Sequence, residues 1–159
     1  MLSKSLLIVT LSLAIVSPAM AAGSSSMSRP STTARSQPTD YELGVKAVQA
    51  GDYQRALVLL QKVVQAEPRN ADAWNYIGFS HRKLKSFDQS LAAYQKALAI
   101  NPDHRGANEY LGELYVMTGD MEKAREQLAK LQSLCRQGCE EYDDLKKAIE
   151  THQSAERKS

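Results

Sequence analysis

The fold is decided by the stretch from Ala71 to Pro102, which reads ADAWNYIGFSHRKLKSFDQSLAAYQKALAINP. Large and small side chains recur at helical spacing in two segments, Trp74–Ile77–Gly78–His81 and Leu91–Tyr94–Ala97–Leu98. A polar turn near Lys85-Ser86 separates them. The second segment ends at Asn101-Pro102, because proline has no N–H to donate and disfavours helical geometry at the residue before it. The stretch therefore predicts a helical hairpin.

The same pattern recurs 34 residues to either side. Gly78 has counterparts at Gly44 and Gly112, and each counterpart follows a leucine, as Gly78 follows Ile77. A glycine inside a helix costs about 1 kcal/mol relative to alanine. A recurring one therefore indicates that another helix approaches closely at that point. We predict three hairpins, over residues 37–70, 71–104 and 105–136.

This unit resembles the tetratricopeptide repeat, a helix–turn–helix motif with a period of about 34 residues. The family pattern is carried here by Trp74, Ile77-Gly78, His81, Ser90, Tyr94, Ala97 and Pro102. The resemblance implies an all-α fold, an α-solenoid of three such hairpins, closed by a C-terminal capping helix. An apolar stripe places that capping helix over residues 140–152, at the end of a repeat domain spanning residues 39–152. Residues 153–159 are expected to form a polar tail.

The first 22 residues have the anatomy of a secretory signal peptide. Lys4 precedes an apolar run over residues 5–16, and Ala19-Met20-Ala21 is a small-x-small cleavage site. The run is shorter than the about 20 residues that a spanning helix needs. We expect cleavage after Ala21 or Ala22 and export to the periplasm; an uncleaved membrane anchor is the alternative. Residues 23–38 are rich in Ser, Thr and Pro, and we predict a disordered linker.

Composition fits one soluble domain with a near-neutral surface. Of the 159 residues, 24% are charged and 43% hydrophobic, and the net charge is +2. No clustered basic face is evident, so the sequence does not indicate a nucleic-acid partner. We expect contact with a membrane only through an uncleaved leader.

Cys135 and Cys139 are the only cysteines. In an exported protein an even count favours a disulfide, which here would staple the capping helix to the last repeat. Zinc would need four ligands, and His81, His104 and His152 show no matching spacing. A catalytic redox pair usually reads C-x-x-C, one residue shorter than this spacing. We expect a disulfide and no metal; two free thiols, and an accessory thiol–disulfide factor using this pair, remain alternatives.

The sequence contains no catalytic set. It has no glycine-rich phosphate loop, no H-E-x-x-H and no nucleophile motif. Glu109 and Glu113 lie one helical turn apart, and we expect both to be solvated carboxylates rather than an acid–base pair. We therefore expect no enzymatic activity and no cofactor.

The resemblance implies a binding function instead, because the first helix of each repeat lines a concave groove. The groove positions carried over from the family are Tyr41, Val45, Val48 and Gln49, then Asn75, Phe79, Arg82 and Lys83, then Glu109, Glu113, Val116 and Met117. This groove would be apolar at one end, basic in the middle and acidic toward the other end. Phe79 and Tyr41 would anchor a peptide, and Arg82 or Lys83 would meet its acidic group. The alternative is that Phe79 packs between adjacent repeats.

One subtype of the family binds the C-terminal carboxylates of chaperone tails through a clamp of Lys, Asn and Arg. The matching positions here include Tyr41, Val45, Tyr76, Gly106 and Tyr110, none of which offers a cation or an amide. The resemblance does not extend to that clamp. We therefore expect a peptide or protein partner of another kind, bound by a scaffold or assembly adaptor. Self-association through the groove or the stack ends is a further candidate.

Overall fold

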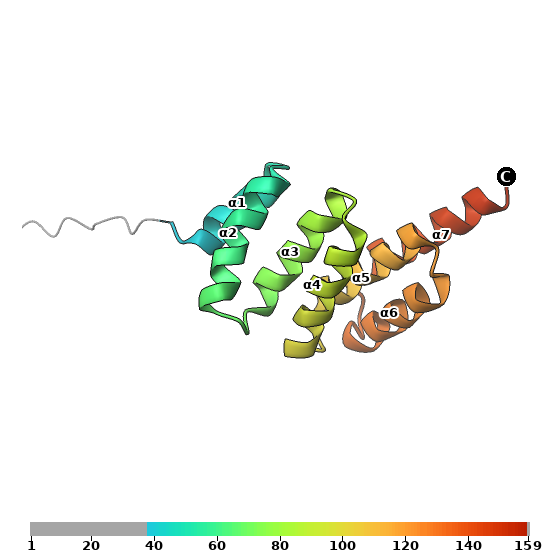
Figure 1. Cartoon of the computed structure of the whole chain (residues 1–159). Coiled ribbons are helices and arrows are strands. Elements are labelled where there is room, and N and C mark those ends of the chain that lie inside the picture. Colours follow the sequence, from blue (N-terminus) through green and yellow to red (C-terminus); the bar gives the residue numbers. More distant parts are fainter. Residues whose placement is uncertain (1–37, 159) are drawn as a thin grey trace, which may run out of the picture. The chain divides into compact units, whose positions relative to one another are not determined.

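A computed structural model describes residues 38–158, which form seven α-helices and no strand (Figure 1). The all-α fold is confirmed. The helices are α1 (Asp40–Gln49), α2 (Tyr53–Ala66), α3 (Ala71–Lys83), α4 (Phe87–Ile100), α5 (Arg105–Thr118), α6 (Met121–Leu134) and α7 (Glu140–Glu156). The predicted signal peptide and nearly all of the predicted linker lie outside the described residues.

Capping side chains explain where several helices begin. The Thr39 hydroxyl accepts from the backbone N–H of Glu42 at 3.2 Å, and the Glu42 carboxylate accepts from the backbone N–H of Thr39 at 2.8 Å. This capping box makes Thr39 the N-cap of α1. At the opposite end of the domain, α7 runs to Glu156 rather than ending at His152.

The three repeated glycines occupy equivalent close contacts. A methyl group added to Gly44 would lie 2.8 Å from the Leu60 side chain, and one added to Gly78 would lie 2.6 Å from the Tyr94 ring. At Gly112 the side chain in contact is Leu145, which belongs to α7 and not to the second helix of the same repeat. The glycines therefore let neighbouring helices approach, and α7 completes the third repeat as a capping helix.

Alternate helices form the two sides of the stack. The first helices of the repeats contact one another in sequence, α1 with α3 and α3 with α5, and α5 then contacts α7. Within residues 38–158 the second helices α2, α4 and α6 make no contacts among themselves. The first helices and α7 therefore converge on one side, which we call the inner face. The second helices form the outer face.

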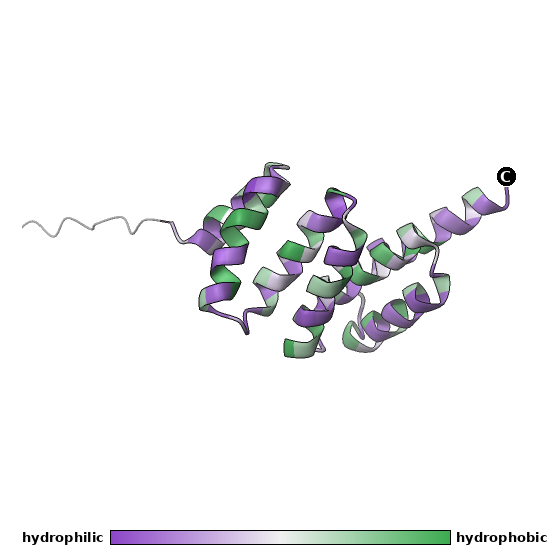
Figure 2. Ribbon diagram, in the orientation of Figure 1, coloured by the Kyte–Doolittle hydropathy of each residue, from purple (hydrophilic) through white to green (hydrophobic). Residues whose placement is uncertain are grey.

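The core lies between these two layers. Leu60, Tyr94, Leu114, Leu131 and Leu145 are fully buried, so large apolar side chains fill the stack from its first hairpin to α7. Figure 2 shows hydrophilic and hydrophobic residues alternating along each helix, as expected for helices that bury one stripe and expose another. None of the helices between residues 38 and 158 is both long and apolar enough to cross a membrane.

The turns inside the hairpins share an unusual backbone conformation. Gly51 and Gly119 have positive φ angles of 75° and 82°, and Lys85 holds the equivalent place in the second repeat with φ of 61°. Glycine adopts this left-handed region freely, whereas a residue with a Cβ does so at a cost. The second hairpin therefore carries local strain that the other two avoid.

Candidate functional site

All twelve predicted groove residues lie on α1, α3 or α5, the three helices that share the inner face with α7. Their exposure differs widely. The exposed ones are Gln49, Lys83 and Met117; the half-buried ones are Tyr41, Val45, Phe79 and Glu113; the buried ones are Val48, Asn75, Arg82, Glu109 and Val116. The centre of the inner face is therefore filled by its own side chains.

Arg82 lies at the centre of the side chains that occupy the inner face. Its side chain is buried, and its Nη2 lies 2.6 Å from the Glu113 carboxylate on the neighbouring helix α5. The guanidinium carbon also lies 5.3 Å from the centre of the Phe79 ring and 5.4 Å from that of Tyr110. Arg82 is thus neutralised within the protein, and the expectation that it would be free to meet an acidic group of a partner is wrong.

Phe79 packs between repeats instead of standing free. Its ring centre lies 4.9 Å from that of Tyr110 on α5 and 6.1 Å from that of Tyr53 on α2. This arrangement is the alternative that the sequence left open. Lys83 keeps its ammonium group 5.0 Å from the Phe79 ring, while its side chain remains exposed. Of the two cations predicted in the middle of the groove, only Lys83 is available to a partner.

Glu109 departs most from expectation. Only 7% of the residue is exposed, and it forms no hydrogen bond or ion pair in the described part of the chain. Burial raises the pKa of its carboxyl group to about 8, and the negative charges of Glu113, Asp144 and Glu141 act in the same direction, while Arg82 opposes them. The sequence placed Glu109 on a solvated surface because it gave no sign that α7 would cover this part of α5.

The acidic residues of α7 are site residues that sequence reasoning missed. The sequence predicts this helix only as a cap for the last repeat. In the structure, Glu141 Oε1 forms an ion pair with Arg105 Nε on α5 at 3.5 Å. Asp144 is an exposed residue directly before the buried Leu145, and it acts electrostatically on Glu109. The contact of α7 with α5 brings both residues to the inner face.

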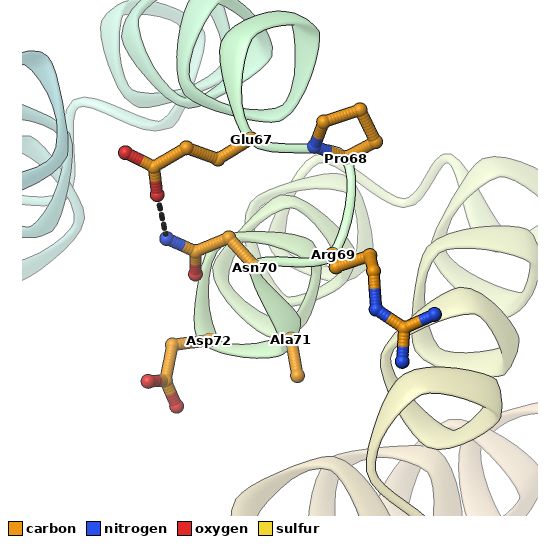
Figure 3. Close-up of a pocket in the computed structure, with 6 residues that line it drawn as sticks. All are labelled: Glu67, Pro68, Arg69, Asn70, Ala71 and Asp72. Carbon is orange, nitrogen blue, oxygen red and sulfur yellow. Dashed lines mark hydrogen bonds between the residues drawn. The ribbon is translucent and has the colours of Figure 1, made fainter.

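A hollow of about 600 Å³ is formed by the turn between α2 and α3 (Figure 3). Two of its polar side chains, Glu67 and Asn70, shape that turn. Glu67 accepts from the Asn70 side-chain amide at 2.9 Å, and the amide oxygen of Asn70 accepts from the backbone N–H of Ala73 at 2.9 Å. The bond to Ala73 caps the N-terminus of α3, so both side chains serve the local structure of the turn.

A second polar hollow, of about 310 Å³, opens where α5 begins. Asp72 and His104 face each other there at 3.0 Å. His104 Nδ1 accepts from the backbone N–H of Ala107, so Nε2 carries the proton that is donated to Asp72. The charged groups at this edge of the inner face are therefore largely paired with one another.

The two cysteines lie in the connection between α6 and α7. Their sulfur atoms are 2.06 Å apart, the distance of a disulfide bond, and their Cα atoms are 5.6 Å apart. With Glu141 they form the one cluster of three potential metal-ligand atoms found among residues 38–158. Because both sulfurs are bonded to each other, neither is a thiolate ligand in this state. The redox alternative stays a prediction.

The sequence model described as Tetratricopeptide repeat matches residues 71–104. Tetratricopeptide repeat protein 37 from Xenopus laevis is 39% identical over 69 residues, which make up 43% of this chain and 4% of that protein. The chain thus spans only a small part of this relative.

Solved structures of other proteins share the fold. The first tetratricopeptide domain of Spaghetti (RPAP3), bound to an HSP90 peptide of sequence SRMEEVD, superposes with a TM-score of 0.63 at 21% identity; the match covers 70% of this chain and 89% of that one. MamA from Desulfovibrio magneticus RS-1 superposes with a TM-score of 0.59 at 28% identity, covering 61% of this chain and 55% of that one. Both chains are similar to the stack described above.

Proposed function

Because the chain belongs to the tetratricopeptide repeat family, we propose that it is a scaffold or assembly adaptor that binds another polypeptide along its inner face. Proteins of this family are generally scaffolds without enzymatic activity that bind peptides or proteins. One observation carries the proposal. Met117 is 50% exposed on α5, beside a rigid set of buried side chains centred on Arg82. Single exposed apolar side chains are common on protein surfaces, so Met117 supports the proposal through its place on the inner face, the side on which repeat stacks bind their partners.

The proposed partner is not an acidic C-terminal tail. The RPAP3 domain holds the peptide SRMEEVD, but here the positions expected for a carboxylate clamp carry Tyr41, Val45, Tyr76, Gly106 and Tyr110. The buried Arg82 is occupied by Glu113 at 2.6 Å. Few cations are thus left on the inner face to receive an acidic peptide.

We place the scaffold in the periplasm, on the sequence pattern of residues 1–22. The mass of the intact protein recovered from cells tests this part. We expect a form that begins at Ala22 or Gly23 in the periplasmic fraction. A full-length chain in the membrane fraction would support the uncleaved anchor instead. We propose no catalytic activity for the chain.

Capture of partners from periplasmic extract tests the binding face. Met117→Ser combined with Lys83→Ser removes two exposed side chains of the inner face. The matched control is Val58→Ser, which alters an exposed apolar side chain on the outer helix α2, 62% exposed. We expect the inner-face variant to lose partners that the wild type and the Val58 variant both recover. Equal recovery with all three baits would contradict the proposal.

A further inference from the structure

The inner face between α5 and α7 holds more carboxylates than cations. Arg82 is held by Glu113 at 2.6 Å and Arg105 by Glu141 at 3.5 Å, so these four charges cancel in pairs. Glu109 remains, with no cation of its own. Asp144 on α7, close enough to Glu109 to act on its charge, has no cation either within the described residues.

The position of Glu109 itself points to a missing partner. The residue is 7% exposed and forms no hydrogen bond in the described chain. Its carboxyl oxygens nevertheless differ from the fully covered polar atoms without partners, such as Asn75 Oδ1 and Arg82 Nε, because they keep some contact with solvent. An ionised carboxyl group so placed would be poorly hydrated and unpaired, which is costly, so Glu109 keeps its proton at neutral pH. An arriving cation would release this proton to solvent and pair with the carboxylate that forms. A cation arriving from the solvent side would supply the missing partner.

We propose that Glu109 and Asp144 together receive one lysine or arginine side chain of the bound polypeptide. The inference rests on the proposed function and specifies its partner as a basic segment. Two carboxylates on neighbouring helices can accept several N–H groups from one cationic head group. The low exposure of Glu109 strengthens the bonds made to it, whereas Asp144 is exposed and open to the arriving side chain.

The same helix also predicts the spacing of the partner's residues. Glu109 and Met117 are eight residues apart on α5, and at about 1.5 Å per residue their Cα atoms are about 12 Å apart along the helix. An extended chain advances about 3.3 Å per residue, so it covers this distance in about four residues. The partner should therefore carry a basic residue about four positions from an apolar residue that contacts Met117. Glu113, which lies between them, is already paired with Arg82.

Labelled synthetic peptides test this inference on the chain as the cell produces it. The probe is a nine-residue Gly/Ser peptide with a lysine at its third position and a leucine at its seventh. Control peptides have glutamine or glutamate in place of the lysine, or a leucine placed one residue after it. The protein variants are Glu109→Gln and Asp144→Asn. Asp88→Asn, on an exposed position of the outer helix α4, is the matched control. Binding is measured by fluorescence anisotropy at low ionic strength.

The outcomes separate the inference from the function on which it rests. We expect the lysine peptide to bind at least fivefold more tightly than the glutamine peptide, and this preference to disappear in Asp144→Asn and Glu109→Gln but not in Asp88→Asn. If the peptides bind with equal affinity, or the preference survives in both site variants, the inference is overturned and the binding face stands. If no peptide binds and the inner-face variant also recovers every partner from extract, both are overturned.

Discussion

Two substitutions one helical turn apart should change stability in opposite directions. Glu109→Gln removes a buried carboxyl group that has no partner, so we expect it to stabilise the fold at neutral and alkaline pH. Glu113→Gln removes the carboxylate that neutralises the buried Arg82 at 2.6 Å, so we expect it to destabilise the fold. The two substitutions are chemically identical, and the only difference is what each carboxyl group contacts.

The magnitude for Glu109 follows from its ionisation. Its pKa is raised from the ordinary value of 4.5 to about 8 in the folded chain. Between these values the folded protein holds a proton that the unfolded chain has lost, so the free energy of unfolding falls as pH rises. At about 1.4 kcal/mol per pH unit the interval corresponds to at most about 5 kcal/mol. Because the carboxyl oxygens keep some solvent contact, we expect about 2 kcal/mol.

The magnitude for Glu113 follows from its ion pair. Removing one partner of a fully buried pair costs about 3–5 kcal/mol, because a charge remains without compensation. The Glu113 side chain is 24% exposed, so water can partly hydrate the abandoned guanidinium. We therefore expect a loss of about 2 kcal/mol.

Urea unfolding followed by circular dichroism, at pH 5, 7 and 9, measures both effects. The stabilisation by Glu109→Gln should be small at pH 5 and should grow to about 2 kcal/mol by pH 9, as the wild type loses stability. If the wild type and this variant show the same pH dependence, Glu109 is hydrated and the reasoning is refuted. A Glu113→Gln variant as stable as the wild type would likewise refute the assignment of the ion pair.

Three further substitutions test the packing of the stack, each by the free energy of unfolding. Lys85→Gly should stabilise by about 0.5–1 kcal/mol, because it relieves a positive φ that glycine adopts freely; an unchanged value would argue against strain there. Gly78→Ala should destabilise by about 1–3 kcal/mol, since its methyl group would meet the Tyr94 ring at 2.6 Å; a neutral effect would mean that the hairpin is loosely packed. Replacing Cys135 and Cys139 together by serine should lower the free energy of unfolding by about 2 kcal/mol and leave the oxidation of thiols in other exported proteins unchanged. A loss of that oxidation would favour the redox alternative.

The fold could be predicted from the sequence because each repeat carries its own local pattern of residues. The glycines at a period of 34 residues, with large side chains and turns at fixed distances from them, identify the hairpins without any knowledge of distant contacts. The packing at the end of the stack was harder to predict from the sequence. Leu145 occupies at Gly112 the place that Tyr94 occupies at Gly78, although α7 has no repeat pattern of its own.

The charges of the inner face were harder to predict than its residues. Arg82 and Glu113 were both identified as groove positions, and their opposite charges on adjacent repeats were a signal of the ion pair that we did not use. The burial of Glu109 gave no such signal. It depends on how closely α7 covers α5, which follows from the packing of whole helices and not from local spacing.

Photo-crosslinking in living cells tests the central claim most directly. A benzoylphenylalanine placed at Met117 reports what touches the inner face, and one placed at Val58 reports what touches the outer face; both positions are exposed. We predict that irradiation crosslinks the protein labelled at position 117, but not the protein labelled at position 58, to a discrete set of other polypeptides. Crosslinks from Val58 alone, or from neither position, would contradict a scaffold that binds its partners along α1, α3, α5 and α7.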